Sequence, residues 1–553
     1  MASPPDADQF FRRWLPAVTN LPISSAAIQT LKRAVVLQPT DLAAQIHLAL
    51  AVQKAGWEKE AMAYHLRAVR LEPLLPDLYS NLGGCQQLLG NFDGAGQKYR
   101  QALVLGPAAA RPLNNLGTDL QAIGRSREAA ICFSRALAAQ PNYNTAFLGL
   151  LIASTYRDDL TPQALRSLHE AFGKYVPRPH HQAPKSMTAS GPLRIGYLSA
   201  DLRNHPVGES ILPVLHHHDR AVFSPYCYAE IRRPDAVTAK CKAAADGWRD
   251  ISGMSDAEVA ATIRADGIHL LVFLAGRFDG NRPQIAAHRA APVQISLHDV
   301  ATSGLAEMDY IIGDRWLIPN KGEEYFSERG LRLPQFYLGV LPSVLPEVET
   351  NDLTGPPVFA CFNNPAKITD TAIALWGKIL GSVPEGRLIL HYMERYGSPS
   401  IRSRIGEGLT ASGASSEQVC FVADPVDRHS FLARYNEIDL ALDTLPFSGS
   451  TTSFQALAMG VPVITWPQGR MVSRWTASML RGIGLPELIA GSAEEYVSLA
   501  VEMAAHRKQW RGRRREIRDR LAASRLCDAA GWTRHLERLY ITVWRRYLNY
   551  ARN

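Results

Sequence analysis

One stretch of the sequence places hydroxyl side chains where a helix should begin. Ser450, Thr451 and Thr452 follow the apolar run 438–443, whose aliphatic residues suit a buried strand. Apolar residues recur at helical spacing directly after them, which predicts a helix N-terminus at the three hydroxyls. Hydroxyls and free backbone N–H groups at such an end can hold a phosphate or diphosphate. The alternative is an ordinary helix that serine or threonine caps.

A lysine and a histidine follow two other predicted strands. Lys367 comes after the apolar run 358–362 through a loop that contains Asn364, and His205 follows a short strand expected at 193–199. In a parallel sheet both positions fall at carboxyl ends of strands, where open α/β sheets bind ligands. An ammonium group can stabilise a leaving diphosphate, and an imidazole can accept a hydroxyl proton. The alternatives are a surface lysine and a loop histidine that hydrogen-bonds the backbone.

Asp266 is a second candidate for proton chemistry. It precedes a predicted strand at 268–274 and could orient His205 or relay protons, or it could cap the preceding helical turn. No cluster of histidines and carboxylates at metal-ligand spacing stands out, so the sequence predicts no metal site. Fixed donors and cations would then have to stabilise a leaving diphosphate.

Composition and length limit the class of protein that must position these residues. With 553 residues the chain is too long for one core, and 46% hydrophobic and 20% charged residues are ordinary for folded domains. The formal charge of +8 fits anionic partners. Seven cysteines without a CxxC pair favour a reducing compartment, which we interpret as the cytoplasm. We expect no signal peptide and no membrane span, since no apolar run is long enough.

Three residue types recur every 34 residues in the N-terminal part. A unit of this length, with small residues at helix crossings and a proline at its end, is typical of the tetratricopeptide repeat. We therefore expect about three units between residues 42 and 144, each made of two antiparallel helices. The recurring positions are Pro39, Pro73, Pro107 and Pro141, then Gly56, Gly90 and Gly124, then Ala68, Ala102 and Ala136.

Asn81 and Asn115 keep the same 34-residue step. On the first helix of a repeat they should face the concave side, where an amide can bind a peptide backbone without reading its sequence. The alternative is that they only hydrogen-bond neighbouring helices. Both interpretations remain open at this point.

After the repeats the pattern changes to strands that alternate with helices. Further apolar runs at 223–228, 293–297 and 310–312 fit a parallel sheet that is covered on both faces. A second alternating series begins at residue 358, and two such sheets normally bind a ligand in the cleft between them. We assign residues 1–160 to the repeat domain, 161–190 to a helix and linker, 191–345 to a first lobe, and 355–553 to a second lobe with C-terminal helices.

Several motifs, in one order along the chain, resemble the SPINDLY and O-GlcNAc transferase family of protein glycosyltransferases, family 41. They are IGYLSADLRNHPVGE, HHHDR, APVQISLHDVATSG, MDYIIGD, FNNPAKIT, YNEIDLALDTLPFSGSTT, MGVPVIT and GLPELIA. The resemblance implies an inverting glycosyltransferase of the GT-B type, with two Rossmann-like lobes and the nucleotide sugar held mainly by the second. It also implies transfer to Ser or Thr of a protein without a metal ion.

The resemblance suggests roles for single residues. Lys367 matches the family lysine on the diphosphate, and the hydroxyls from Ser450 to Thr452 match the loop that caps its other oxygens. His205 matches the family histidine proposed as a base or as a ligand of the sugar and acceptor. Lys367 and these hydroxyls, with Asn364, form part of the expected donor site, whereas His205 is expected to act on the acceptor side.

The segment that frames the nucleotide base and ribose in the family is matched by Arg428, Phe431 and Arg434. Phe431 stands where the family more often has His, so a stacking surface is kept while a hydrogen-bonding option is lost. Gln455 stands where the family usually has Asp or Glu on the ribose hydroxyls, so an acceptor is kept without its charge. These departures bear on the identity of the donor.

The first lobe departs from the family in two places. This chain has Gly276-Arg277-Phe278 where much of the SPINDLY group has Gly-His-Thr. From His298 it reads HDVAT, where the family has Gly-Tyr-Pro-Gly-Thr. Both are expected on strand-to-loop edges that face the cleft. They could alter the choice of sugar or acceptor, or mark a lobe that no longer catalyses.

The C-terminal segment 506–520 reads HRKQWRGRRREIRDR and is strongly basic. Because its one aromatic residue is Trp510 and no nucleic-acid fold surrounds it, we interpret it as a solvated helix face that steers anions and predict no nucleic-acid partner. The aromatic helix expected at 532–550 should pack back across the lobes.

The sequence thus predicts a cytoplasmic protein O-glycosyltransferase, with UDP-GlcNAc as the leading co-substrate and no further cofactor. The repeats would recruit protein acceptors. One alternative is another donor on the same fold, such as GDP-fucose or a UDP-hexose. The other is a repeat-based binding scaffold with a degenerate transferase.

Overall fold

The computed structural model describes most of the chain, and its contacts form two compact units. The first unit is built mainly from residues before Leu151 and the second mainly from those after it. The residues described are 25–178, 191–278, 280–320, 324–350 and 355–552.

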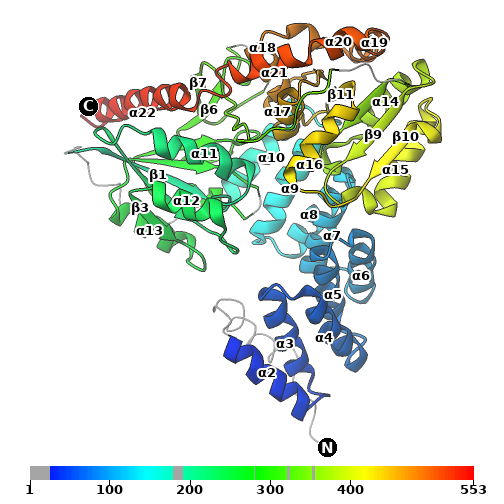
Figure 1. The fold of residues 1–553 in the computed structure, drawn as a ribbon. Helices are drawn as coiled ribbons and strands as arrows, with labels where there is room; N and C mark the ends of the chain where they lie inside the picture. The colour runs from blue at the N-terminus through cyan, green and yellow to red at the C-terminus, as the bar shows by residue number, and fades with distance from the viewer. Residues whose placement is uncertain (1–24, 179–190, 279, 321–323, 351–354, 553) are drawn as a thin grey trace, which may run out of the picture. The chain divides into compact units, whose positions relative to one another are not determined.

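Helices of the first unit come in pairs (Figure 1). The helices α3, α5, α7 and α9 begin 34 residues apart, and so do α4, α6 and α8, which confirms the predicted repeats. Their bounds are α2 (Ser25–Leu37), α3 (Leu42–Lys54), α4 (Glu58–Leu71), α5 (Pro76–Leu88), α6 (Phe92–Leu105), α7 (Ala110–Ala122), α8 (Ser126–Ala139) and α9 (Asn144–Tyr156).

The recurring glycines explain the period physically. Gly56, Gly90 and Gly124 follow the first helix of each pair with φ values of 86°, 79° and 85°, a left-handed conformation that glycine adopts without strain. The recurring alanines are fully buried where helices cross. Each repeat is therefore defined by a turn that needs glycine and a crossing that needs a small side chain.

The first sheet of the second unit has seven parallel strands in the order β3-β2-β1-β4-β5-β6-β7. Its central strands are fully buried, which is why their sequences are continuous apolar runs. The edge strands β3 and β7 are largely exposed and were not expected from the sequence. The strands are β1 (Leu193–Ser199), β2 (Phe223–Ala229), β3 (Gly247–Asp250), β4 (Leu270–Leu274), β5 (Val293–Leu297), β6 (Tyr310–Asp314) and β7 (Arg329–Leu333), with helices α11 (Pro206–His217), α12 (Ala236–Ala244) and α13 (Asp256–Ala265).

The second sheet has five parallel strands in the order β10-β9-β8-β11-β12. The helices that the site uses are α16 and α17, which flank β11 in the sequence. The strands are β8 (Val358–Cys361), β9 (Arg387–His391), β10 (Val419–Val422), β11 (Leu440–Leu442) and β12 (Val463–Ile464), and the helices are α14 (Asp370–Ser382), α15 (Pro399–Ala411), α16 (Arg428–Ala433), α17 (Thr451–Ala458), α18 (Trp475–Gly482) and α19 (Ala493–Ala505).

Both sheets share one topological feature. In each, the first strand lies between the second and the fourth, so β1 neighbours β4 and β8 neighbours β11. The connections that follow the two strands of each pair therefore run in opposite directions along the sheet. Open α/β sheets bind ligands at the carboxyl ends of such strands. The two expected Rossmann-like lobes are present, and their switch points are where a site should form.

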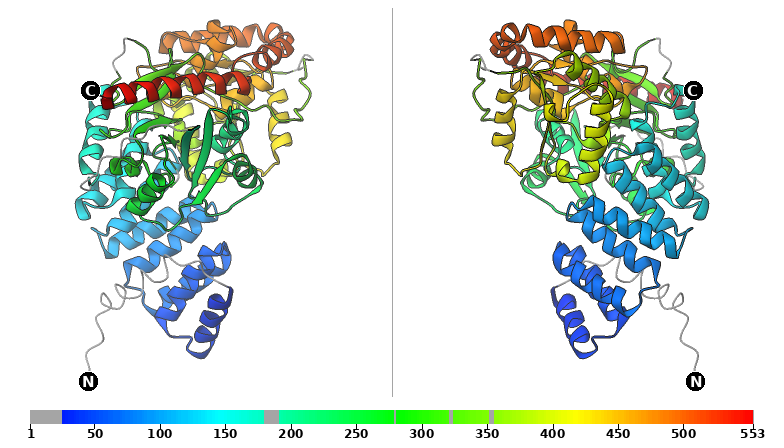
Figure 2. Two further views of the ribbon diagram at one scale, coloured as in Figure 1. Left: turned by 90° about the vertical axis from the view of Figure 1, so that its left-hand side faces the viewer. Right: turned by 90° about the vertical axis from the view of Figure 1, so that its right-hand side faces the viewer.

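The C-terminal helix α22 (Ala529–Arg552) returns to the first lobe (Figures 1 and 2). Trp532, Leu536 and Tyr540 are buried in the core of the first sheet, and the hydroxyl oxygens of Tyr197 and Tyr540 lie 3.3 Å apart. The last helix therefore covers a sheet formed far earlier in the chain. Among the residues described, no helix is both long and apolar enough to cross a membrane.

The basic segment forms α20 (Arg507–Gly512) and α21 (Arg514–Ala522), and two of its arginines are buried instead of solvated as we expected. Arg511 and Arg514 are only 2% and 0% exposed. Arg511 donates to Asp439 at 3.0 Å, and Arg514 donates to the carbonyls of Tyr435 and Ile438. Burial lowers the pKa of Arg514 to about 9. The expectation was wrong for these two arginines because the turn before β11 leaves buried acceptors that need donors.

Candidate functional site

Lys367 lies just beyond the carboxyl end of β8, on the short 3-10 turn η2 (Pro365–Lys367). Asn364 shapes this turn, since its side chain accepts a hydrogen bond from the backbone N–H of Ala366 at 3.1 Å. The Nζ of Lys367 donates to the carbonyl of Ser448 at 3.0 Å and lies 4.3 Å from the ring centroid of Phe447. The lysine thereby joins the loop after β8 to the loop after β11.

The electrostatic state of Lys367 suits an anion site. Burial lowers its pKa to about 8, against the opposing effect of the Asp443 carboxylate, so the ammonium still predominates at neutral pH. Of its three possible donor hydrogens, one is used in a hydrogen bond with the described residues. Within the same residues, no group of three or more His, Cys, Asp and Glu side chains could hold a metal ion.

Asp443 organises the loop that leads to α17, a role that we did not predict. Its carboxylate accepts the backbone N–H of Thr444 at 2.9 Å, the N–H of Gly449 at 2.6 Å and the hydroxyl of Thr465 at 2.7 Å. Burial raises the pKa of Asp443, and these donors oppose that shift. The available signal was an acidic residue at the end of a buried strand, where an unpaired charge would be costly.

The three hydroxyls at the start of α17 have different surroundings. Ser450 is the N-cap residue, but its side chain makes no capping hydrogen bond to this helix. Thr451 accepts a long hydrogen bond of 3.5 Å from the Tyr337 hydroxyl, whereas Thr452 donates to Asn363 at 2.6 Å. Asn363, which sequence reasoning missed, thus ties the loop after β8 to the amino end of α17. The predicted phosphate-binding elements are brought together.

The segment expected to frame the nucleoside forms α16 and the turn that follows it. Arg428 donates to both carboxylate oxygens of Glu209 in α11, at 2.7 and 3.1 Å, and so links the two lobes. Arg434 pairs with Asp424 within the second lobe. Phe431 instead packs into an aromatic cluster, with ring centroids 5.6 Å from Phe362, 5.3 Å from His391 and 6.0 Å from Tyr435.

A cavity that is open to solvent lies between the lobes, and its empty volume of about 440 Å³ includes part of that open solvent. Its second-lobe wall includes the predicted residues Arg428, Thr451 and Gln455. Its first-lobe wall comes from the start of α11, and residues around 337–345 close it further. The polar side chains in its lining include Glu209, Tyr337, Arg428, Thr451 and Gln455.

His205 stands at the N-cap of α11, directly before Pro206, which lines this cavity. Its Nδ1 accepts the backbone N–H of Val207 at 3.3 Å and lies 3.6 Å from Oδ1 of the buried Asp201. A neutral imidazole has one donor and one acceptor nitrogen. With Nδ1 as acceptor, Nε2 carries the proton and presents a donor. A proton on Nδ1, directed at Asp201, would instead make Nε2 the acceptor nitrogen, which could act as a base.

Asp266 is not brought to His205, contrary to the role that we considered for it. It is the C-cap residue of α13, and its carboxylate pairs with Arg249 at 2.6 Å and accepts the Tyr228 hydroxyl at 2.9 Å. Because Asp266 precedes β4, it lies at the amino edge of the sheet, whereas His205 follows β1 at the carboxyl edge. Asp201 occupies the place beside the histidine instead.

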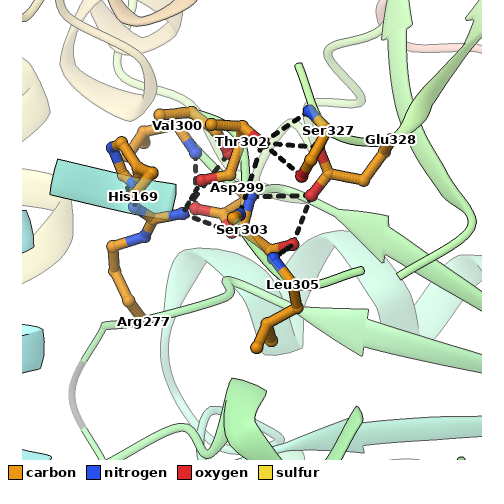
Figure 3. A network of polar contacts seen from close by, with 11 residues as sticks. His169, Arg277, Asp299, Val300, Thr302, Ser303, Leu305, Ser327 and Glu328 are labelled. Atoms are coloured by element: carbon orange, nitrogen blue, oxygen red, sulfur yellow. Dashed lines mark hydrogen bonds and ion pairs between the residues drawn. The ribbon is translucent and has the colours of Figure 1, made fainter. Parts of the chain in front are cut away.

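The departures at Arg277 and at the segment after His298 form a buried network (Figure 3). Arg277 is 3% exposed and donates to Nδ1 of His169 in α10 (Pro162–Tyr175) at 2.7 Å, to Asp299 at 3.2 Å and to the carbonyl of Thr302 at 2.6 Å. Burial, with Arg277 beside it, holds the pKa of His169 well below its usual range. Arg277 therefore does not face the open cleft as expected, because its acceptors lie inside the first lobe.

The rest of this segment is fixed as well. Glu328 accepts the hydroxyl of Thr302 and the backbone N–H of Ser303, each at 2.7 Å, as Figure 3 shows. His298 has a φ of 61°, and its ring centroid lies 5.7 Å from that of Phe336. Burial lowers the pKa of His298 to about 4, so it is neutral at physiological pH. The two departures from the family pattern thus form one interconnected structure.

In the first unit, Asn81 and Asn115 hydrogen-bond between neighbouring helices. Asn81 in α5 accepts from Arg111 in α7 at 3.0 Å, and Asn115 in α7 donates to Ser80 in α5 at 3.3 Å. These are the bonds that the alternative interpretation required. Binding of a peptide by the same amides stays a prediction.

Comparison with known proteins places this geometry in a family. The model of glycosyl transferase family 41 matches residues 173–353 and 348–536. A protein of Oryza sativa subsp. japonica, named probable UDP-N-acetylglucosamine–peptide N-acetylglucosaminyltransferase SPINDLY, is 33% identical over 430 residues, which cover 75% of this chain and 46% of that protein. Its namesake from Solanum lycopersicum is 31% identical over 424 residues, covering 74% and 45%. The chain spans about half the length of the curated relatives that it matches.

Among solved structures, a lysine-to-methionine mutant of Thermobaculum terrenum O-GlcNAc transferase aligns with a TM-score of 0.86 and 34% identity. The alignment covers 92% of this chain and 98% of that one, which confirms helical repeats followed by a GT-B region. The family match, the relatives and the solved structure agree on the family and the fold. The chain belongs to glycosyl transferase family 41.

Proposed function

We propose that the protein is an inverting, metal-independent glycosyltransferase that moves GlcNAc from UDP-GlcNAc to Ser or Thr of protein acceptors recruited by the repeats. The observation that carries the proposal is the position of Lys367, a half-buried ammonium beside the loop that leads into α17, with one hydrogen bond to the described residues. The names of the relatives, which specify UDP-N-acetylglucosamine and a peptide, support this choice of donor and acceptor.

The chemistry requires stabilisation of a leaving nucleoside diphosphate. Lys367 supplies a full positive charge, and the free N–H groups of α17 supply a partial one. The Phe447 ring covers one side of the ammonium and keeps water from it, which strengthens its attraction for an anion. Asn363 and Asp443 hold the two loops, so these charges are in place before the donor binds.

His205 is proposed to act on the opposite side of the cleft. With Nδ1 accepting the Val207 amide, its Nε2–H would hydrogen-bond an oxygen of the sugar or acceptor. As a base it would take the hydroxyl proton at Nε2 while Nδ1–H faces Asp201. The hydrogen bond from Val207 supports the first arrangement. The rate of the variant His205→Gln would distinguish the two.

A cytoplasmic location is part of the proposal. All seven cysteines are free thiols in the structure, as expected for a protein of a reducing compartment. Burial raises the pKa of the Cys227 and Cys361 thiols well above the usual range, so these two are unreactive.

The direct test is an assay of the purified chain with UDP-GlcNAc, GDP-fucose and a UDP-hexose, each with cellular proteins as acceptors. We expect release of UDP from UDP-GlcNAc and an intact-mass increase of one GlcNAc residue on an acceptor. Lys367→Met should lower the rate of transfer by roughly 10³-fold. The matched control Lys378→Met, an exposed lysine of α14, should leave it unchanged. Peptide binding without turnover of any donor would favour the scaffold instead, and turnover of another donor would replace GlcNAc.

A further inference from the structure

The cavity between the lobes contains a carboxylate that the mechanism above does not use. Glu209 of α11 and Gln455 of α17 both line it, on the first-lobe and second-lobe walls. Thr451 at the amino end of α17 lines the same cavity, and Gln455 lies one helical turn further along the same face. If a diphosphate binds at the start of α17, the ribose that is attached to it would lie between Gln455 and Glu209.

The carboxylate of Glu209 has acceptor capacity to spare. Arg428 donates one hydrogen bond to each of its oxygens, at 2.7 and 3.1 Å. A carboxylate offers about four lone-pair sites, so about two remain. Its side chain is 26% exposed, which leaves those sites reachable from the cavity. Two acceptor sites on one carboxylate fit the two O–H donors of a vicinal diol.

The ion pair also removes an electrostatic obstacle. A lone carboxylate in the same cavity would repel the two charges of a diphosphate. Arg428 cancels the charge of Glu209 at hydrogen-bond distance while leaving lone pairs available. The pair can thus accept hydroxyl protons without weakening the binding of an anion nearby.

We propose that Glu209 binds the 2′- and 3′-hydroxyls of the donor ribose, with Arg428 as its positioning residue and Gln455 on the facing wall. The proposal rests on the proposed function, because it assumes a nucleotide sugar in this cavity. It makes nucleotide binding a property of both lobes, since the ribose contact comes from the first and the diphosphate contacts from the second. It also predicts selection of ribonucleotides over nucleotides that lack the diol.

The test measures binding of UDP and 2′,3′-dideoxy-UDP to the full chain by calorimetry. Because bonds to a charged acceptor are lost, we expect Glu209→Gln to weaken UDP about tenfold and to change dideoxy-UDP less than about twofold. The control is Glu230→Gln, since Glu230 pairs with Arg282 at 3.2 Å, has a side chain 29% exposed and does not line the cavity. It should change neither affinity.

Comparing the two nucleotides cancels any effect of Glu209→Gln on the contact between the lobes, since that effect is common to both. Arg428→Gln leaves the charge of Glu209 uncompensated, so both nucleotides should bind more weakly, most clearly at low salt. Equal weakening of both nucleotides by Glu209→Gln, or of neither, would overturn the ribose contact while leaving the proposed function intact. If GDP binds and UDP does not, GDP and its dideoxy form are compared. Failure of the wild type to bind either diphosphate would overturn the proposed function itself.

Discussion

Two cations stand at corresponding places in the two lobes, and Arg277 is buried whereas Lys367 is half-buried. Arg277 follows β4 and Lys367 follows β8, and both strands belong to the switch point of their sheet. Both terminal nitrogens of Arg277 donate to protein acceptors, His169 on one side and Asp299 with a carbonyl on the other. Lys367 makes one hydrogen bond to the described residues, to the Ser448 carbonyl.

The difference shows how one topology supports two roles. A cation that donates to several protein acceptors holds chain segments together, and its removal leaves those buried acceptors without partners. A partly buried cation that has a single protein acceptor can bind a ligand that supplies further acceptors. Position at a switch point therefore does not by itself make a binding site. The number of protein acceptors around each cation decides between the two roles.

The largest expected effect is that of Lys367→Met on transfer. We expect kcat/KM to fall by roughly 10³, as for loss of a group that stabilises a leaving anion. Thermal unfolding should stay unchanged or move slightly upward, since methionine does not have to lose the hydration of an ammonium. Steady-state kinetics and calorimetry measure both. A large fall in Tm without a specific loss of rate would make Lys367 structural and end the contrast with Arg277.

Arg277→Met should show the reverse pattern. Loss of a buried partner should lower the free energy of unfolding by about 3 kcal/mol, because Asp299 keeps its charge without a cation. The double variant Arg277→Met with Asp299→Asn should recover at least about 1 kcal/mol of it. Denaturant titration of the three variants gives these values. Unchanged stability with lost transfer would instead place Arg277 in the reacting site.

Variants of His205 test the role of the first-lobe side of the cleft. His205→Ala should lower kcat about 10²-fold, a typical contribution of a positioned imidazole. His205→Gln keeps an N–H donor close to the place of Nε2, so we expect it to retain most of the wild-type rate if Nε2 acts as a donor. Single-turnover rates at saturating donor decide the question. A glutamine variant as slow as the alanine variant would show that the imidazole acts as a base.

The smallest expected effect is the change of UDP affinity with pH. Lys367 binds a diphosphate as an ammonium, and with a pKa of about 8 it is charged below that pH and loses its charge above it. The affinity for UDP should therefore weaken about tenfold from about pH 7 to about pH 9. Calorimetry across this range, with Lys367→Met as a flat reference, tests the sign. An affinity that rises with pH would contradict it.

The sequence predicted elements whose cause is local. The 34-residue repeat follows from left-handed glycines and buried alanines, both of which recur visibly in the sequence. The strands β1, β5 and β8 appear as apolar runs because both faces of a parallel sheet are buried. Lys367 and the hydroxyls after Gly449 could be placed together because carboxyl ends of parallel strands meet at one edge.

Other contacts could not be read from local pattern. Asp266 looked like a partner for His205, yet it precedes its strand and falls at the opposite edge. Arg514 looked solvated in a run of charges, yet it is fully buried against carbonyls. In each case the side chain's partner is supplied by a segment that no periodicity within its own stretch reveals.

What the sequence by itself determined was the set of elements and the strand ends that carry polar groups, because burial and turn geometry act over a few residues. Only the tertiary structure decided which polar groups meet. Arg277 reaches His169 across 108 positions of sequence, and Arg428 reaches Glu209 across 219. Such pairs form because folding brings distant segments within hydrogen-bond distance and a buried charge then needs a partner, whichever segment supplies it.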